Sequence, residues 1–310
     1  MSRLLLRLAA SLGLVALVLW LVDPWRVLTA LGRPDGRWLA AGFGAALSAT
    51  VASALRWRLL ARWLDVRAPW RVFLLAYWRG ITANTVLPGG TLGGDALRAL
   101  HLQQAGNALA PTAISVALDR ISGLWVLVVI SLATTALALA TGLMPAAALP
   151  LPWPTAALLA LLAVLAPLVL WHLSASTRHL LPGKLARLLD AIHDRPHPLR
   201  QYLLQLAGSA LVQALSILAF ACGGKAVGLD LALWLYFIAA GPIFIFAALP
   251  VSVGGWGTRE AAAAVTLGLF AAPRELAVAS AILYGLFAAL QGLLGALTLI
   301  HRAPQENHDA

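Results

Sequence analysis

Seven ionisable side chains lie within or beside strongly apolar stretches of the sequence. They are Arg79, Asp95, Arg98, Asp119, Arg120, Arg259 and Glu260. An ionisable group at the centre of a membrane span costs about 2.5–3.5 kcal/mol, so these groups must be paired, hydrated or close to the membrane surface. Asp95 and Arg98 are three residues apart and could pair on one helix face. Two interpretations therefore stay open: the charges neutralise one another, or they bind a ligand.

Two glycine-rich motifs accompany these charges. Residues 87–98 read Leu-Pro-Gly-Gly-Thr-Leu-Gly-Gly-Asp-Ala-Leu-Arg, and residues 249–260 read Leu-Pro-Val-Ser-Val-Gly-Gly-Trp-Gly-Thr-Arg-Glu. Proline and paired glycines interrupt helices, and an interrupted backbone survives in a bilayer only where protein or water satisfies its amides. Matching interruptions in two halves of a chain are typical of a transporter's binding site.

The paired glycines of each motif are expected to precede a helix start. A helix N-terminus offers free amides and a partial positive charge to an anion such as phosphate. Arg98 and Arg259 would bind an anionic head group, Asn84 would add a neutral hydrogen bond, and Asp95 and Glu260 would tune the charge. Two such ends meeting near the membrane midplane would form one pocket. The candidate substrate-binding residues are Asn84, Pro88, Gly93, Gly94, Asp95, Arg98, Asp119, Arg120, Gly254, Gly255, Arg259 and Glu260.

The composition indicates a polytopic membrane protein. Hydrophobic residues make up 61% of the 310 residues and charged residues only 11%, against about 25% charged residues in soluble domains. We expect a single integral membrane domain over 1–310, with one polar cytoplasmic loop at 174–200. The net charge of +10 lies mostly in short loops beside apolar segments, so no nucleic-acid partner is expected.

The expected fold is an all-α polytopic membrane protein with about six full transmembrane helices and two helical hairpins. The full spans are predicted at 4–22, 38–55, 113–140, 155–173, 201–222 and 276–300. The regions 72–109 and 233–272 each consist of two short apolar arms around a glycine-rich motif. Because these arms are too short to cross about 30 Å of hydrocarbon comfortably, re-entrant hairpins are favoured over two thin full spans.

The distribution of Lys and Arg predicts the orientation. With the N-terminus inside, 13 basic residues lie in inside segments and five in outside loops, so both termini are expected in the cytoplasm. The hairpins then enter from opposite sides, and 38–140 and 201–300 form inverted pseudo-repeats. Tryptophans are expected to anchor both interfaces, with Trp57 and Trp63 in the inner belt.

Catalytic and metal sites find little support in the sequence. The acidic residues lie mostly beside arginines, which favours ion pairs over acid–base chemistry. His193 and His197 have a metal-ligand spacing, but Pro196 and Pro198 interrupt the helix that they would need. No nucleotide-binding pattern is present, and no cofactor is expected.

Three motifs resemble one known family. They are Thr82-x-Asn84 with Pro88 and Gly93-Gly94-Asp95-x-x-Arg98, then Leu118-Asp119-Arg120-x-x-Gly123-Leu124, and then Leu249-Pro250-x-Ser252-x-Gly254-Gly255-x-Gly257-x-Arg259-Glu260. In this order they resemble the lysylphosphatidylglycerol synthase transmembrane-region family, over about residues 5–300. The resemblance implies a flippase-like protein of a bacterial inner membrane. The longer family members carry a cytosolic aminoacyl-transferase domain; no such domain is expected in residues 1–310, and neither is lysyl transfer.

Three functions are compatible with these features. The leading hypothesis is a transporter or flippase for an anionic phospholipid, a polyprenyl-phosphate carrier or a related amphiphile. The second is a membrane enzyme acting on a lipid-linked phosphate or sugar, with Asp95 or Glu260 catalytic. The third is a non-catalytic subunit that docks a lipid or glycan biosynthetic enzyme. With no ATP site in the sequence, transport would be passive or driven by a gradient.

Overall fold

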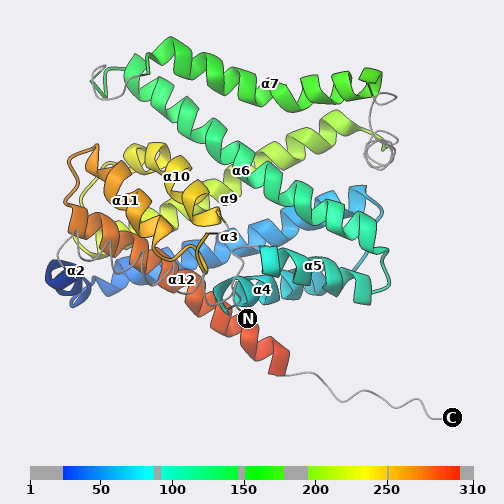
Figure 1. The fold of residues 1–310 in the computed structure, drawn as a ribbon, viewed down its shortest axis with the longest axis horizontal. Coiled ribbons are helices and arrows are strands. Elements are labelled where there is room, and N and C mark those ends of the chain that lie inside the picture. The colour runs from blue at the N-terminus through cyan, green and yellow to red at the C-terminus, as the bar shows by residue number, and fades with distance from the viewer. Residues whose placement is uncertain (1–23, 87–91, 146–150, 178–194, 250, 301–310) are drawn as a thin grey trace.

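The computed structural model shows an all-helical protein. It describes residues 24–86, 92–145, 151–177, 195–249 and 251–300. The predicted span 4–22, the site candidate Pro88 and most of the loop 174–200 lie outside these residues. The helices within them are α2 (Pro24–Leu31), α3 (Gly36–Trp63), α4 (Trp70–Val86), α5 (Leu92–Gln104), α6 (Leu109–Ala140), α7 (Trp153–Thr177), α9 (Pro198–Ala226), α10 (Leu233–Ala248), α11 (Thr258–Gly268) and α12 (Arg274–Ile300) (Figure 1).

Five helices are long and apolar enough to cross a membrane: α3, α6, α7, α9 and α12. They confirm the five predicted spans that lie within the described residues. The main difference is at α3, which continues eight residues beyond the predicted end at residue 55. The predicted span ended at residue 55 and so counted Arg56 among the 13 basic residues of the inside segments, outside the helix, and this was wrong. No proline or glycine interrupts residues 45–63, and Arg56 finds buried partners within the helix bundle.

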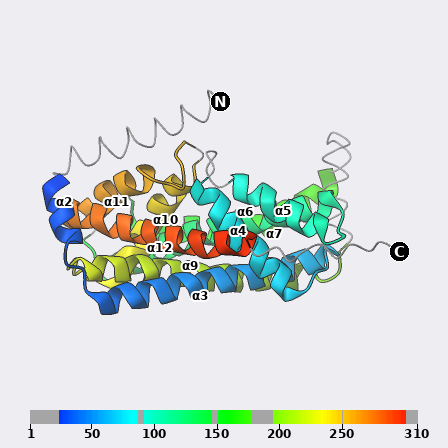
Figure 2. The same ribbon diagram turned by 90° about the horizontal axis from the view of Figure 1, so that it is seen from below.

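The two glycine-rich regions form pairs of short helices, as predicted. The first pair, α4 and α5, has 17 and 13 residues, and the second, α10 and α11, has 16 and 11. The longest of these helices is therefore only about 25 Å long. The pairs lie toward opposite ends of the molecule in Figures 1 and 2. They meet where the Gly254 loop approaches the carbonyl oxygen of Asn84 in the last turn of α4.

The helix packing has the same pattern in both halves. Helix α3 packs along α9, and each short pair packs on the long helix that closes the other half: α4 on α12, and α10 on α6. Figure 2 shows α3 and α9 along one side of the molecule. The helices of the two halves can be paired in chain order: α2 with α7, α3 with α9, α4 with α10, α5 with α11 and α6 with α12. When each helix is replaced by its counterpart, every principal contact between two helices corresponds to another contact that the structure contains. The predicted inverted pseudo-repeats would account for this exchange.

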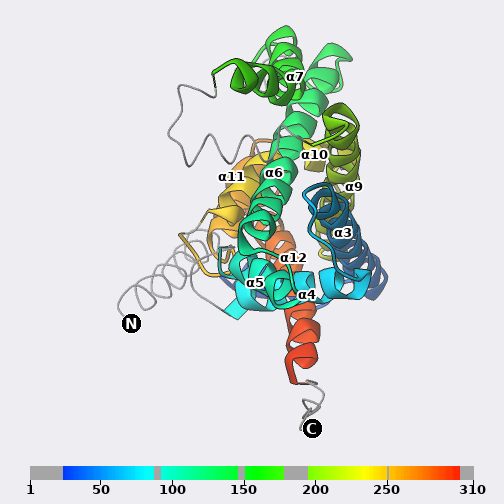
Figure 3. The ribbon, with the colours of Figure 1, turned by 90° about the vertical axis from the view of Figure 1, so that its right-hand side faces the viewer.

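Helix α7 lies at the edge of the molecule, against α6 (Figure 3). Pro167 lies inside α7 and lacks the N–H that would bond to the carbonyl of Ala163. The indole N–H of Trp125 on α6 donates to that carbonyl at 2.8 Å, and the Tyr202 hydroxyl donates to the next carbonyl, of Val164, at 2.6 Å. Side chains of two other helices thus satisfy the backbone beside the proline.

Candidate functional site

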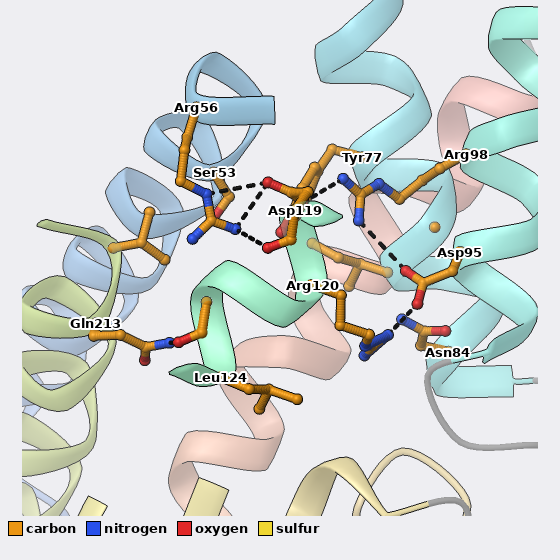
Figure 4. Close-up of a pocket in the computed structure, with 14 residues that line it drawn as sticks. Ser53, Arg56, Tyr77, Asn84, Asp95, Arg98, Asp119, Arg120, Leu124 and Gln213 are labelled. Atoms are coloured by element: carbon orange, nitrogen blue, oxygen red, sulfur yellow. Dashed lines mark hydrogen bonds and ion pairs between the residues drawn. The ribbon is translucent and has the colours of Figure 1, made fainter. Parts of the chain in front are cut away.

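A buried carboxylate on α6 joins arginines from two other helices. Asp119 is 1% exposed, and one of its oxygens accepts from Arg56 of α3 at 2.8 and 3.1 Å. Its other oxygen accepts from Arg98 of α5 at 2.6 Å (Figure 4). Arg56 also donates to the carbonyl of Asp119 and to the hydroxyl of Ser209 on α9. Asp119 thereby links α3, α5 and α6 at one point.

A second carboxylate extends this network. Asp95, in the first turn of α5, pairs with Arg98 at 3.4 Å and with Arg120 of α6. Helices α5 and α6 are therefore held together by two crossed ion pairs, Arg98 with Asp119 and Arg120 with Asp95 (Figure 4). The predicted local pair of Asp95 and Arg98 is present, but the shortest bonds run between helices.

The guanidinium of Arg98 lies against two aromatic rings. It sits 4.2 Å from the ring centroid of Trp57 and 4.3 Å from that of Tyr77, distances typical of cation–π contacts. Arg98 is only 5% exposed, yet its Nε atom has no hydrogen-bond partner among the residues that the structure describes. A buried donor without a partner is costly, and a ligand could supply the missing acceptor.

The expected interfacial role of Trp57 was wrong. Trp57 is completely buried, packs edge-to-face on Phe73 and donates its indole N–H to Ser115 at 3.0 Å. The arginines beside it in the sequence suggested a membrane surface, whereas α3 places Trp57 in the wall that supports Arg98.

The charged network lines a cavity of about 180 Å³. Its wall holds three arginines and two carboxylates, which leaves one positive charge in excess. Uncharged groups complete the wall, among them Ser53, Tyr77, Asn84 and Gln213 (Figure 4). The charged residues on the wall are Arg56, Asp95, Arg98, Asp119 and Arg120. The excess charge favours an anionic ligand over a neutral or cationic one.

Glycines let the helices approach closely enough to form this site. A Cβ added to Gly94 would overlap the carbonyl oxygen of Gly80, so α4 and α5 could not keep their present spacing. A Cβ at Gly208 would lie 3.0 Å from the side chain of Arg56, and one at Gly123 would lie 3.3 Å from its guanidinium. These positions make room for Arg56 between α6 and α9.

The first motif is arranged differently from its prediction. Gly93 and Gly94 lie inside the first turn of α5, which begins at Leu92, and the N–H of Gly94 donates to the side chain of Asn84 at 2.9 Å. The Gly94 amide is therefore occupied by the protein itself, because Asn84 serves as its acceptor. Asn84 still lines the cavity.

A residue of the second motif also accepts a hydrogen bond from a backbone amide at the start of helix α11. Gly254 and Gly255 have φ of 58° and 78°, a backbone region that glycine tolerates best. Glu260 accepts from the N–H of Gly257 at 2.6 Å and from Arg259 at 2.6 and 3.1 Å. A protein carboxylate thus occupies the N-terminus of α11, which was predicted to bind a ligand.

The two motifs come together, but their arginines do not share one described cavity. The wall of the charged cavity includes Arg98 and omits Arg259 and Glu260. Arg259 instead pairs with Glu260, lies 4.9 Å from the ring centroid of Trp256 and packs against Gly285 of α12. The predicted site residues therefore separate into a group at the cavity and a group that caps α11.

Only Asn84, Asp95, Arg98, Asp119 and Arg120 of the cavity wall were candidates from the sequence, and the residues missed include Ser53, Arg56, Tyr77 and Gln213. Arg56 was counted with the loop arginines, although the absence of a helix breaker over 45–63 could have placed it within the helix. Gln213 donates to the carbonyl of Gly123 at 2.8 Å, a contact between residues 90 positions apart. No local pattern indicates such a contact.

A comparison with protein families identifies the family of the chain. The family model described as "Lysylphosphatidylglycerol synthase TM region" matches residues 4–295. No curated protein matches the sequence significantly. The family match covers nearly the whole chain, including all three motifs and every charged residue of the cavity. The chain therefore belongs to the lysylphosphatidylglycerol synthase transmembrane-region family.

Proposed function

We propose that this protein transports a lipid with an anionic head group between the leaflets of a bacterial cytoplasmic membrane. The observation that carries the proposal is the cavity with an excess positive charge and a buried, unpartnered Nε on Arg98. An anionic oxygen at this point would complete the hydrogen bonds of the guanidinium and offset the excess charge. The family supports a lipid-related membrane role.

The proposed mechanism is a competition for Arg98. Its strongest partner is Asp119, at 2.6 Å. A phosphate that binds Arg98 would weaken this pair and leave Asp119 bonded to Arg56, at 2.8 Å. The tie between α5 and α6 would then depend on Asp95 and Arg120. Binding would thus favour a state in which the first hairpin can move relative to α6.

Both termini would lie in the cytoplasm, and the first hairpin would enter the membrane from that side. The end of the first hairpin at which the chain enters and leaves the membrane would then face the inner leaflet. The corresponding end of the second hairpin would face the outer leaflet. Since each hairpin packs on a long helix of the other half, movement of one pair would be transmitted to the other half. This coupling would allow the cavity to open to each leaflet in turn.

A leaflet-resolved assay tests the proposal. The protein is reconstituted into liposomes with fluorescent phosphatidylglycerol, phosphatidylcholine or polyprenyl phosphate, and the accessible label is quenched from outside. We expect one anionic class to become accessible and phosphatidylcholine to remain protected. Arg98→Met should reduce the rate at least tenfold, whereas Arg62→Met, at an exposed position of α3, should not. Arg98→Lys keeps the charge and should retain part of the activity.

Three outcomes would contradict the proposal. Movement of the neutral and anionic lipids at equal rates would exclude selection by charge. Product formation from a lipid in detergent, without movement between leaflets, would instead favour a membrane enzyme. Loss of a biosynthetic activity after deletion of 174–200, with Arg98→Ala silent, would favour a docking subunit.

A further inference from the structure

A second cavity of about 270 Å³ adjoins the charged one. The two cavities share wall residues from three helices, so they are adjacent. The shared residues are Ser53, Tyr77, Ile81, Val212 and Gln213. The volume is close to the lower end of the range for small-molecule sites, about 300–1,000 Å³. A ligand bound at Arg98 therefore has a neighbouring space into which another part of it can extend.

The polar groups on the described wall of the second cavity carry no charge. Thr50 donates to the side-chain oxygen of Gln291 at 2.6 Å, and both residues are more than nine-tenths buried. This bond leaves the Thr50 oxygen as an acceptor and the amide N–H groups of Gln291 as donors for other partners. Gln213 uses its amide nitrogen on Gly123, so its oxygen remains an acceptor. Donors and acceptors without charge match hydroxyl groups.

Aromatic rings form the rest of this wall. Tyr284 and Phe244 are stacked at 5.1 Å between centroids, and Phe287 lies nearby in the same wall. Apolar surface with a few placed hydrogen-bonding groups is the usual composition of a site for a small organic group. A polyol or sugar presents C–H groups to such rings and hydroxyls to the amides.

We infer that the second cavity binds an uncharged, hydroxyl-bearing group attached to the phosphate of the transported lipid. The inference rests on the proposed function, because it places the phosphate at Arg98. It specifies the substrate class as an anionic lipid with a glycerol-like or glycosyl head group. A cationic head group would meet no carboxylate on the described wall of the second cavity and an excess of positive charge in the first.

The test compares two lipids of equal charge. Short-chain phosphatidylglycerol and phosphatidylpropanol differ only in the two hydroxyls of the head group. Each is titrated calorimetrically into the detergent-solubilised protein. We expect the wild type to bind phosphatidylglycerol about tenfold more tightly, as two modest hydrogen bonds would give. Gln291→Leu and Thr50→Val should each remove most of this preference and leave the affinity for phosphatidylpropanol unchanged.

Gln201→Leu serves as the matched control, because Gln201 is also a buried glutamine but does not line either cavity. It should keep the preference of the wild type. Free glycerol phosphate, titrated alongside, should bind far more weakly than phosphatidylglycerol, since it lacks the acyl chains. Equally tight binding of glycerol phosphate would identify a soluble ligand and overturn the inference.

The outcomes separate this inference from the proposed function. If wild type binds both lipids equally and Arg98→Met weakens both, the anionic site stands and the second-cavity inference is wrong. If Gln291→Leu and Thr50→Val weaken both lipids to the same extent, their role is structural and the inference is also wrong. If neither lipid binds to the folded wild type, the inference is wrong, and polyprenyl phosphate is left as the anionic lipid that the leaflet-resolved assay must test.

Discussion

At the residue scale, the site consists of charges that mostly neutralise one another. Arg56, Asp119 and Arg98 form a chain of ion pairs, and Asp95 continues it to Arg120. Desolvating such groups is expensive, so pairing is required whatever the function. The ligand hypothesis therefore depends on what pairing leaves over: one excess positive charge and the unpartnered Nε of Arg98.

Replacing Asp119 should reveal how strongly the network stabilises the bundle. Asp119→Asn leaves two buried arginines without their main partner, and we expect a loss of about 3 kcal/mol or more in the free energy of unfolding. Asp65→Asn breaks an ion pair with Arg195 in which Asp65 is 66% exposed, and it should cost less than about 1 kcal/mol. Denaturation of both variants in the same detergent makes the comparison. Equal losses of unfolding free energy would show that the buried ion pairs of Asp119 stabilise the protein no more than the exposed pair of Asp65.

Four of the five charged residues on the cavity wall were identified from the sequence, but their partners on other helices were not. Arginine and aspartate in apolar stretches are conspicuous because their insertion is costly, which is why Asp95, Arg98, Asp119 and Arg120 could be identified. The bonds of Asp119 to Arg56, and of Gly94 to Asn84, depend on how separate helices meet. A sequence pattern does not show how closely two helices approach each other. The backbone amides at the helix N-termini were therefore expected to be free to bind a ligand.

At the element scale, the short helix pairs are held in place by close contacts at glycine. The two motifs were predicted to interrupt helices. Helix α4 ends at Val86 and α5 begins at Leu92, and α10 ends at Ala248 and α11 begins at Thr258. Their spacing against neighbours was not predictable, because it depends on residues far apart in sequence. Gly94 fits against Gly80 within the first pair, and Gly255 approaches Ala247 within the second.

Substitution of Gly94 by alanine should separate α4 from α5. The added Cβ would overlap the carbonyl of Gly80, so we expect a lower melting temperature and weaker binding of anionic lipid. Gly44→Ala is the control, because a Cβ at Gly44 would meet nothing within 4 Å. In that exposed helical position alanine should be neutral or stabilising by up to about 1 kcal/mol. A harmless Gly94→Ala would contradict the close packing of the first pair.

The contact of α7 with α6 can be tested by a double-mutant cycle. Trp125→Phe removes the donor to the Ala163 carbonyl, which Pro167 leaves without its helical partner, and should cost about 1–2 kcal/mol. In a Pro167→Ala background the backbone N–H can bond to Ala163, so the same substitution should cost less. Unfolding of the four proteins in detergent gives the coupling energy. Equal costs in both backgrounds would exclude the role assigned to Trp125.

At the scale of the whole molecule, two features of different origin each divide the chain into halves. The count of basic residues predicts two halves of opposite orientation, and the principal helix contacts are unchanged when the halves are exchanged. The charged side chains are not arranged in the same way in the two halves. The first half contributes the open, charged cavity wall, whereas in the second half Arg259 and Glu260 form a pair beside Trp256.

The orientation can be tested by labelling single cysteines. Cys222, which is buried, is replaced by serine, and Asp230→Cys and Arg67→Cys are introduced in turn at exposed loop positions. An impermeant maleimide should label residue 230 in intact spheroplasts and residue 67 only after permeabilisation. The reverse result would invert the topology, and with it the assignment of the first hairpin to the cytoplasmic side.

The central claim is that the Arg98 cavity binds the anionic head group. The most direct measurement is an experimental structure in nanodiscs that contain the anionic lipid found to move in the leaflet-resolved assay. The account predicts phosphate density within hydrogen-bonding distance of Arg98, with the distance from Arg98 to Asp119 longer than the present 2.6 Å. An empty cavity at saturating lipid, with the Arg98–Asp119 pair unchanged, would contradict the account.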